Sequence, residues 1–308
     1  MVNVVQFMHP GDEVDPSKLV RYKGWNVTER HARRLLRHRG EYVNSQKQLV
    51  SADITFWNEY EAPTNCTPIL GGIRGWEFAK NVHEIITPSQ APALVVQRGS
   101  DGCCVNTDPC VFGKTFKYSN CQQVPNGDLW NIPIGSLILF GSYRRSLFAL
   151  DTVFVVGESG IAYRVPTKRR PLPFKTSKEY RFVTLDNLTV RKDKRCACPI
   201  DRFMFYRGKT PLLRNGKIDF ESIFSYTPSK VYGSPDFNKR CMLDLNCLNT
   251  FMQNNNIVSR KLFSPGLTQG HSSIIVNGTN QEVRLVWKEV RRIVQKVNKF
   301  ELGVHFPW

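Results

Sequence analysis

The segment SLILFGSYRRSLFALDTVFVVGE (residues 136–158) decides the fold class of this 308-residue chain. It holds two runs, SLILFG and FALDTVFVVGE, whose β-branched and aromatic residues and flanking turns are typical of strands. The runs VNVVQFM (2–8), ADITFW (52–57) and ALVVQR (93–98) have the same character. Because several of these runs are apolar throughout, we expect a central, largely buried sheet.

A helix near the C-terminus is predicted by its capping signal. Thr279 and Glu282 have the spacing of a capping box. Apolar residues then recur at helical spacing as far as Phe300, and basic residues occupy the other face, where solvated charge is the ordinary interpretation. The predicted fold class is therefore mixed α/β, a central and largely buried sheet with flanking helices.

A second, shorter helix is predicted over residues 26–40. Asn26 and Glu29 have the capping-box spacing, Leu35 and Leu36 belong to an apolar stripe, and Gly40 supplies a stop. We expect its exposed face to carry the basic side chains Arg30, Arg33, Arg34 and Arg37.

Charge divides the chain into two parts. Residues 1–150 carry 16 Lys and Arg against 13 Asp and Glu, whereas residues 151–308 carry 27 against 13. We expect an α/β domain with the candidate pocket over residues 1–165 and a basic half over residues 166–308 that ends in the long amphipathic helix. A single domain is the alternative.

The net charge of +17 and the pI near 9.6 favour an anionic partner. Nucleic acid, and DNA in particular, is the leading prediction. An anionic membrane surface or an unspecific basic surface is the alternative. No basic segment has the bulky aromatic face of an interfacial helix, which counts against the membrane. Besides the four arginines above, the candidate phosphate contacts are Lys168, Arg169, Arg170, Arg191, Lys192, Lys194 and Arg195, in a Pro-punctuated tract. A solvated surface would explain each cluster equally well.

The N-terminal residues lack the pattern of a signal peptide, and no apolar run reaches the roughly 18 residues of a membrane span, so we expect a cytoplasmic protein. Nine cysteines, an odd count, fit reduced thiols better than a disulfide framework. Because no tight C-x2–4-C pair is present, buried thiols are favoured over zinc, and no metal or cofactor is predicted.

Acidic and aromatic residues alternate in SADITFWNEYEAPTNC (residues 51–66). On a strand, Trp57, Glu59 and Glu61 project to one face, where an apolar neighbour raises a carboxylate's pKa and suits it to acid–base chemistry. Exposed charges on an edge strand are the alternative. His9 follows the first predicted strand, where loops of α/β sheets line sites, although a surface turn histidine fits as well.

One further stretch, VNTDPCVFGKTFKYSNC (residues 105–121), combines turn-forming residues with aromatic ones. Its NTDPC resembles the Gly-Gln-Asp-Pro-Tyr loop of uracil-DNA glycosylases. The resemblance implies that Asp108 positions the attacking water and that Cys110 stands where the family has Tyr. The smaller side chain leaves room beside C5, which implies a 5-substituted pyrimidine such as modified cytosine in phage DNA.

The same resemblance extends to base binding. Phe112, Phe116 or Tyr118 would stack on an extruded base, and the amide of Asn120 would contact its Watson–Crick edge. A purely structural turn, in which Asp108 caps its own backbone, is the alternative.

Residues 132–158 are similar to the core of the small barrels called PUA-like, which include readers of modified bases in RNA and DNA. This likeness implies a small β-barrel-like segment, although an ordinary β-hairpin gives the same pattern.

The preferred function is a DNA glycosylase that extrudes a modified base and hydrolyses its N-glycosidic bond, with Asp108 or Glu59 activating water. A non-catalytic reader of the same base is the main alternative. A nuclease that holds Mg²⁺ with Asp53, Glu59 and Glu61 is the third. The oligomeric state stays open.

Overall fold

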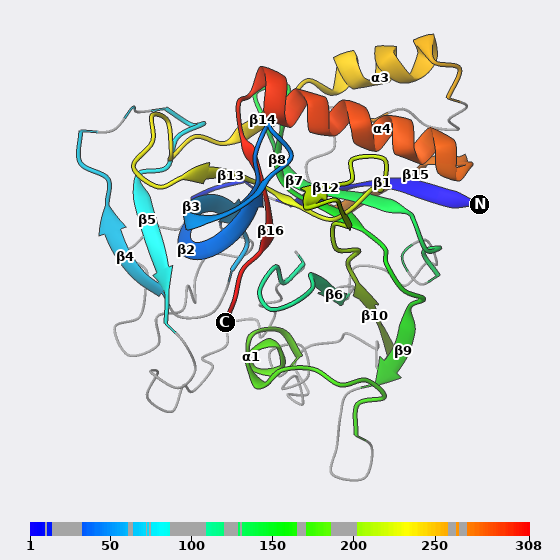
Figure 1. The fold of residues 1–308 in the computed structure, drawn as a ribbon, viewed down its shortest axis with the longest axis horizontal. Helices are drawn as coiled ribbons and strands as arrows, with labels where there is room; N and C mark the ends of the chain where they lie inside the picture. The colour runs from blue at the N-terminus through cyan, green and yellow to red at the C-terminus, as the bar shows by residue number, and fades with distance from the viewer. Residues whose placement is uncertain are drawn as a thin grey trace.

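The computed structural model is sheet-rich, with two large sheets at its centre (Figure 1). It describes residues 1–9, 11–13, 33–60, 64–71, 73, 75–86, 109–119, 129, 131–164, 171–185, 202–257, 263–264 and 270–308. The predicted strand over residues 93–98 lies outside this part of the chain.

The five-stranded sheet has the order β14-β8-β7-β1-β15. Its strands are β1 (Val2–His9), β7 (Leu137–Arg144), β8 (Leu147–Val155), β14 (Cys241–Leu243) and β15 (Gly270–Gly278). Strand β1 runs parallel to β7, whereas the other neighbours are antiparallel. The strands predicted in residues 2–8 and 136–158 are confirmed.

Both faces of this sheet are covered, which explains its uninterrupted apolar runs. Along β1, Val4 and Met8 pack into the core beneath α4, whereas Val5 and Phe7 pack into a second, aromatic core on the opposite face. All eight β1 residues are buried. The alternation follows from the two-residue period of a strand, so the expected burial of the central sheet is confirmed.

The six-stranded sheet has the order β16-β13-β3-β2-β5-β4. Its strands are β2 (Arg34–Val43), β3 (Leu49–Asn58), β4 (Thr64–Pro68), β5 (Asn81–Ile85), β13 (Thr227–Val231) and β16 (Glu301–His305). Because β16 pairs with β2 as well as with β13, the strands β2, β3, β13 and β16 close into a small ring. Residues 132–158 lie outside this ring and form the β7–β8 hairpin, so their likeness to PUA-like barrels stays a prediction.

Smaller elements complete the description. A three-stranded sheet contains β6 (Lys117–Ser119), β9 (Ile161–Arg164) and β10 (Arg202–Arg207), and β11 (Leu213–Arg214) pairs with β12 (Lys217–Ile218). The short helix α1 (Lys178–Tyr180) continues into a π-helical turn, η2 (Arg181–Leu185).

The predicted C-terminal helix is confirmed as α4 (Asn280–Arg292), continued by the π-helical turn η3 (Ile293–Val297). Thr279 and Glu282 form the expected capping box. Helix α4 packs against β1 and β15, with α3 (Leu245–Asn254) beside it (Figure 1). The described helices are few, so the fold is mixed α/β in the broad sense only. None of them is long and apolar enough to cross a bilayer.

The helix predicted over residues 26–40 is wrong where the structure describes this stretch, because Arg34–Val43 form strand β2. All ten residues of β2 are paired with β3. Leu35 packs beside Trp57, whereas Leu36 enters the aromatic core, so the two leucines lie on opposite faces as strand residues do. Long-range pairing therefore overrides the local helical pattern.

The strands of the two predicted halves are hydrogen-bonded into common sheets. Strands β14 and β15 follow residue 165 yet complete the sheet of β1, β7 and β8, and β13 and β16 complete the sheet of β2 and β3. An independent domain needs its own core. The boundary near residue 165 therefore does not separate two hydrogen-bonded units, and the single-domain alternative agrees better with this topology.

Candidate functional site

Polar and charged side chains converge where the parallel strands β1 and β7 end. His9 is the last residue of β1 and lies opposite Ser142 of β7, while Met8 lies opposite Gly141. From the other sheet, Glu59 directly follows the end of β3. The carboxyl ends of parallel strands are the usual place for ligand sites in α/β sheets.

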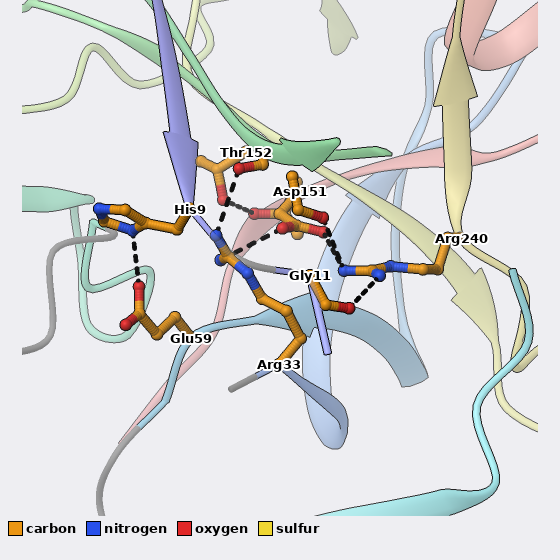
Figure 2. Close-up of polar contacts among 10 residues, drawn as sticks. His9, Gly11, Arg33, Glu59, Asp151, Thr152 and Arg240 are labelled. Atoms are coloured by element: carbon orange, nitrogen blue, oxygen red, sulfur yellow. Dashed lines mark hydrogen bonds and ion pairs between the residues drawn. The ribbon is translucent and has the colours of Figure 1, made fainter. Parts of the chain in front are cut away.

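His9 and Glu59 form the centre of this site. The Nδ1 atom of His9 lies 2.9 Å from Oε2 of Glu59, and both side chains are 0% exposed (Figure 2). The ring of Phe7 meets the imidazole edge to face, with the centroids 4.8 Å apart. A buried carboxylate at this distance fixes the orientation of the imidazole and stabilises a proton on it, and the low local dielectric strengthens that interaction.

Beside this pair lies a second buried charged group that contains one carboxylate and two guanidinium groups. Nη1 of Arg33 is 3.2 Å from Oδ2 of Asp151, and Nη2 of Arg240 is 3.8 Å from Oδ1 (Figure 2). The three side chains are at most 2% exposed. Burying a charge away from water costs free energy, so each of these three side chains relies on its oppositely charged partner.

The two arginines also hold the backbone that follows His9 and the adjacent part of β7. Arg240 donates to the carbonyl oxygen of Gly11 at 2.7 Å and to Oγ of Ser142 at 3.1 Å. Arg33 donates from Nη2 to the carbonyl oxygen of Gly141 at 3.3 Å and from its backbone amide to Asp12. The segment after β1 is thereby fixed against the end of β7.

Gly11 permits this close approach. A Cβ atom at residue 11 would lie 2.6 Å from Oγ and 2.8 Å from Cβ of Ser142, and 3.2 Å from Nη1 of Arg240. Real Cβ contacts are not that short, so a side chain here would push the segment away from β7.

Trp57 does not have the predicted role in this structure. Its ring is buried, the guanidinium of Arg240 lies 4.4 Å from the ring centroid, and its indole Nε1 donates to the carbonyl oxygen of Lys239. The position of Trp57 near Glu59 in the sequence also predicts a contact with the substrate base, and such a contact would need Arg240 to leave the face of the indole.

The aromatic residues proposed to stack on a base are core residues. Phe112 is buried among Tyr60, Phe306 and other rings, and Tyr118 packs on Phe7 with its ring stacked on Tyr206. Because both rings are buried, neither is open to a base in this conformation.

Cys110 is also a buried residue. Burial raises the pKa of its thiol and that of the Tyr60 phenol, and the two groups interact electrostatically. Tyr60 directly follows Glu59 in the chain. The described end of the NTDPC stretch therefore packs against Tyr60, the residue after Glu59.

Three of the predicted phosphate contacts have other roles. Arg33 is buried against Asp151, and Arg34 is buried with its Nη1 atom 3.3 Å from Oγ1 of Thr64. Arg37 is paired with two carboxylates and lies 4.0 Å over the ring of Tyr232; its ion pairs are with Asp53 at 2.9 Å and Glu84 at 3.0 Å. In this structure Arg33 and Arg34 are buried and Arg37 is paired with two carboxylates, so nothing here supports phosphate contacts by these arginines, which stay a prediction.

The carboxylates proposed for Mg²⁺ do not converge. Asp53 and Glu59 are separated by six positions of extended chain, roughly 20 Å at about 3.3 Å per residue, and Asp53 is engaged by Arg37. No three His, Cys, Asp or Glu side chains of the described residues are arranged to hold one ion. This geometry disfavours the nuclease alternative.

A second histidine forms a polar group on β4 and β5. Nδ1 of His83 lies 2.9 Å from Oγ1 of Thr64, and Nε2 lies 3.7 Å from Sγ of Cys66. Burial and the charge of Arg34 lower the pKa of His83 to about 3, and burial raises the pKa of Cys66 to about 11. Both groups are therefore neutral near pH 7, which does not suit a thiolate nucleophile.

The remaining predicted site residues lie outside the described residues. They are Asp108, Asn120, Arg30, Glu61, Lys168, Arg169, Arg170, Arg191, Lys192, Lys194 and Arg195.

Sequence reasoning missed Asp151 and Arg240. Asp151 had a usable signal, because a lone carboxylate inside the apolar run FALDTVFVV must find a partner once that strand is buried. Arg240 had none, since basic residues of this kind are usually exposed.

No family model, curated protein or solved structure matches this chain.

Proposed function

We propose that this protein binds DNA, extrudes a modified base and hydrolyses its N-glycosidic bond, with Glu59 and His9 as the acid–base pair. The observation that carries the proposal is the 2.9 Å contact between two fully buried ionisable side chains at the carboxyl ends of β1 and β7. Buried pairs of ionisable side chains are costly to maintain, and the carboxyl ends of parallel strands are the usual place for ligand sites.

In the proposed reaction, a water oxygen bonds to C1′ of the sugar while the bond from C1′ to the base nitrogen breaks. The electron pair of that bond leaves with the base. The Glu59–His9 pair accepts a proton from the water and passes it to the departing base, and the sugar keeps the hydroxyl group. A carboxylate next to an imidazole can also stabilise the positive charge that develops on the sugar.

Access to the pair requires a local rearrangement, because both side chains are covered in this conformation. Base extrusion supplies a reason for such an arrangement. A site closed to water until a base enters avoids futile proton exchange and strengthens electrostatic interactions during the reaction.

Asp108 remains a second candidate for activating water. Its neighbour Cys110 lies near Tyr60, and Tyr60 adjoins Glu59. Asp108 itself lies outside the described residues, so its role stays a prediction. We expect Asp108→Asn to abolish turnover while DNA binding stays within about tenfold of the wild type; surviving turnover would remove Asp108 from the mechanism.

The choice of substrate is tested by offering DNA with unmodified, methylated, hydroxymethylated or glucosylated cytosine in the presence of EDTA. Free base is measured by mass spectrometry, and abasic sites are measured as alkali-labile breaks. We expect release of one modified base and no release of unmodified cytosine.

Each alternative function has its own outcome in this experiment. Modification-dependent binding to intact DNA would identify a reader rather than an enzyme. Strand breaks that appear in a parallel reaction with Mg²⁺ and are absent from the reaction with EDTA would identify a nuclease.

A further inference from the structure

The outer face of α4 adjoins two turns that also carry basic residues. The first is the turn of residues 44–48, which contains Lys47, and the second is the segment 215–221, which includes strand β12 and contains Lys217 and Phe220. The backbone amide of Ile218 donates to the carbonyl oxygen of Lys47, which holds the two turns together. In Figure 1 the β11–β12 hairpin lies beneath the middle of α4, and a contact between Lys288 of α4 and Glu221 joins them.

We call this area the α4 surface and define it by its charged side chains. They are Lys47, Arg214, Lys217, Asp219, Glu221, Arg284, Lys288, Glu289, Arg291 and Arg292.

The carboxylates of the α4 surface are already engaged. Asp219 pairs with Arg214 at 2.9 Å, Glu221 pairs with Lys288 at 2.6 Å, and Glu289 pairs with Arg292 at 2.8 Å. Four cations of the surface, Lys47, Lys217, Arg284 and Arg291, form no ion pair with a carboxylate of the described residues. An excess of positive charge therefore remains on one face.

Arg291 is held rigidly within this surface. Its guanidinium lies 4.0 Å over the ring of Phe220 and 5.5 Å from the ring of Trp287. Stacking restricts the side chain before a ligand arrives, so less conformational entropy is lost when its N–H groups donate to a phosphate.

We propose that the α4 surface binds the phosphate backbone of duplex DNA. The inference rests on the proposed function for the class of its partner, but not on the chemistry of the His9–Glu59 pair. Helix α4 has 13 residues, about 20 Å at 1.5 Å per residue. Duplex DNA carries one negative charge per about 1.7 Å of its axis, so several phosphates face a surface of this length.

The side chains of the surface favour a duplex over a single strand. Proteins that bind single strands stack bases on exposed rings, whereas Phe220 and Trp287 are buried here. They also favour DNA over a lipid bilayer, because an interfacial helix inserts bulky apolar side chains and the basic face of α4 carries none. Contacts to phosphates, without base recognition, are what this geometry provides.

The test compares two variants in the full-length chain, each with four basic residues replaced by Gln. The first removes the unpaired cations Lys47, Lys217, Arg284 and Arg291. The matched control removes four exposed lysines of other regions, Lys80, Lys114, Lys175 and Lys178. Both variants lose the same charge, so a difference between them reports position rather than net charge.

The measurement is the affinity for an unmodified 20-base-pair duplex from 50 to 200 mM salt, in a Glu59→Gln background that removes turnover. Each phosphate contact contributes about 0.9 to the slope of log affinity against log salt. We expect the first variant to flatten the slope by roughly 3 to 4, and the control to change it by less than about 1. Circular dichroism and thermal unfolding establish that both variants are folded.

Equal slopes for the two variants would overturn the proposal, and so would a wild-type protein that does not bind the duplex. Loss of binding to phosphatidylserine vesicles, with binding to DNA unchanged, would also overturn it and assign the surface to a membrane. The first variant could flatten the slope even if the wild type releases no base from any DNA. That result would support DNA binding by the α4 surface and reject the hydrolytic function.

Discussion

The buried charged group beside His9 and the α4 surface use the same residue type in opposite ways. Arg33 and Arg240 are covered, share Asp151 and fix the backbone after β1. Arg284 and Arg291 form no ion pair with a carboxylate of the described residues, although Glu221 interacts with both at longer range, and Arg284 is exposed. The comparison teaches that burial and pairing, rather than the density of arginines in the sequence, separate a structural cation from one that is available to a ligand.

Substitution of Asp151 should have the largest effect on stability, because Asp151→Ala leaves two buried guanidinium groups without their carboxylate. Breaking a buried ion pair typically costs about 3–5 kcal/mol. We expect a loss of that size in the free energy of unfolding, measured by urea denaturation.

The control for this prediction is Asp53→Ala, which breaks the exposed ion pair with Arg37. Exposed ion pairs contribute about 0–1 kcal/mol. Similar losses in the free energy of unfolding for Asp151→Ala and Asp53→Ala would contradict the claim that the buried arginines stabilise the fold more than Arg37 does.

Gly11→Ala tests, with a smaller expected loss of stability, whether the segment after β1 is held against β7. The new Cβ would lie 2.6 Å from Oγ of Ser142, and overpacking of this kind costs about 1–3 kcal/mol. Adding Ser142→Gly removes the atoms that clash, so we expect the double variant to recover part of the loss. If Gly11→Ala alone is neutral in thermal unfolding, the segment after β1 is not fixed as described.

Acidification should destabilise the protein through His83. Burial lowers the pKa of its folded state to about 3, so the unfolded chain, with a pKa near 6.5, binds the proton more tightly. Stability from this group is present above about pH 6.5 and is lost as the pH falls, by at most about 1.4 kcal/mol per pH unit. We expect His83→Asn to flatten the loss between pH 6.5 and 5, and an unchanged curve would contradict the burial of a neutral ring.

Removing an exposed cation of the α4 surface should change stability least. Arg284 makes no ion pair with a described carboxylate, and surface substitutions of this kind usually stay within about 0.5 kcal/mol. We expect Arg284→Gln to leave thermal unfolding unchanged, even though it weakens binding to DNA. A large loss of stability would contradict this and indicate that Arg284, like Arg33, stabilises the fold.

The elements predicted correctly are those whose signal is long or carries its own cap. The apolar runs that became β1, β3, β7 and β8 fit only buried strands, and the capping box at Thr279 fixed the start of α4. Strand β2 was missed because the neighbours Leu35 and Leu36 fit one stripe of a helix as well as two faces of a strand. Only pairing with β3 decides between them.

The candidate site could be predicted in its parts but not as a whole. His9 and Glu59 were each proposed from local pattern, yet they are 50 positions apart and come from different sheets. Their contact follows from how the sheets pack, which no local spacing encodes. The base-stacking role of Phe112 and Tyr118 gains no support from this conformation, because an aromatic residue in a polar stretch can equally well fill a core.

The central claim is that the Glu59–His9 pair performs hydrolysis, and the most direct test is the single-turnover rate of base release by Glu59→Gln. The variant keeps the size of the side chain and removes its charge. Loss of a general acid–base group lowers rates by about 10²–10⁴-fold, which we predict for Glu59→Gln with little change in thermal unfolding, whereas the control Glu84→Gln should keep the wild-type rate. Base release by Glu59→Gln at the wild-type rate, or no base release by the wild type from any modified DNA, would contradict the account.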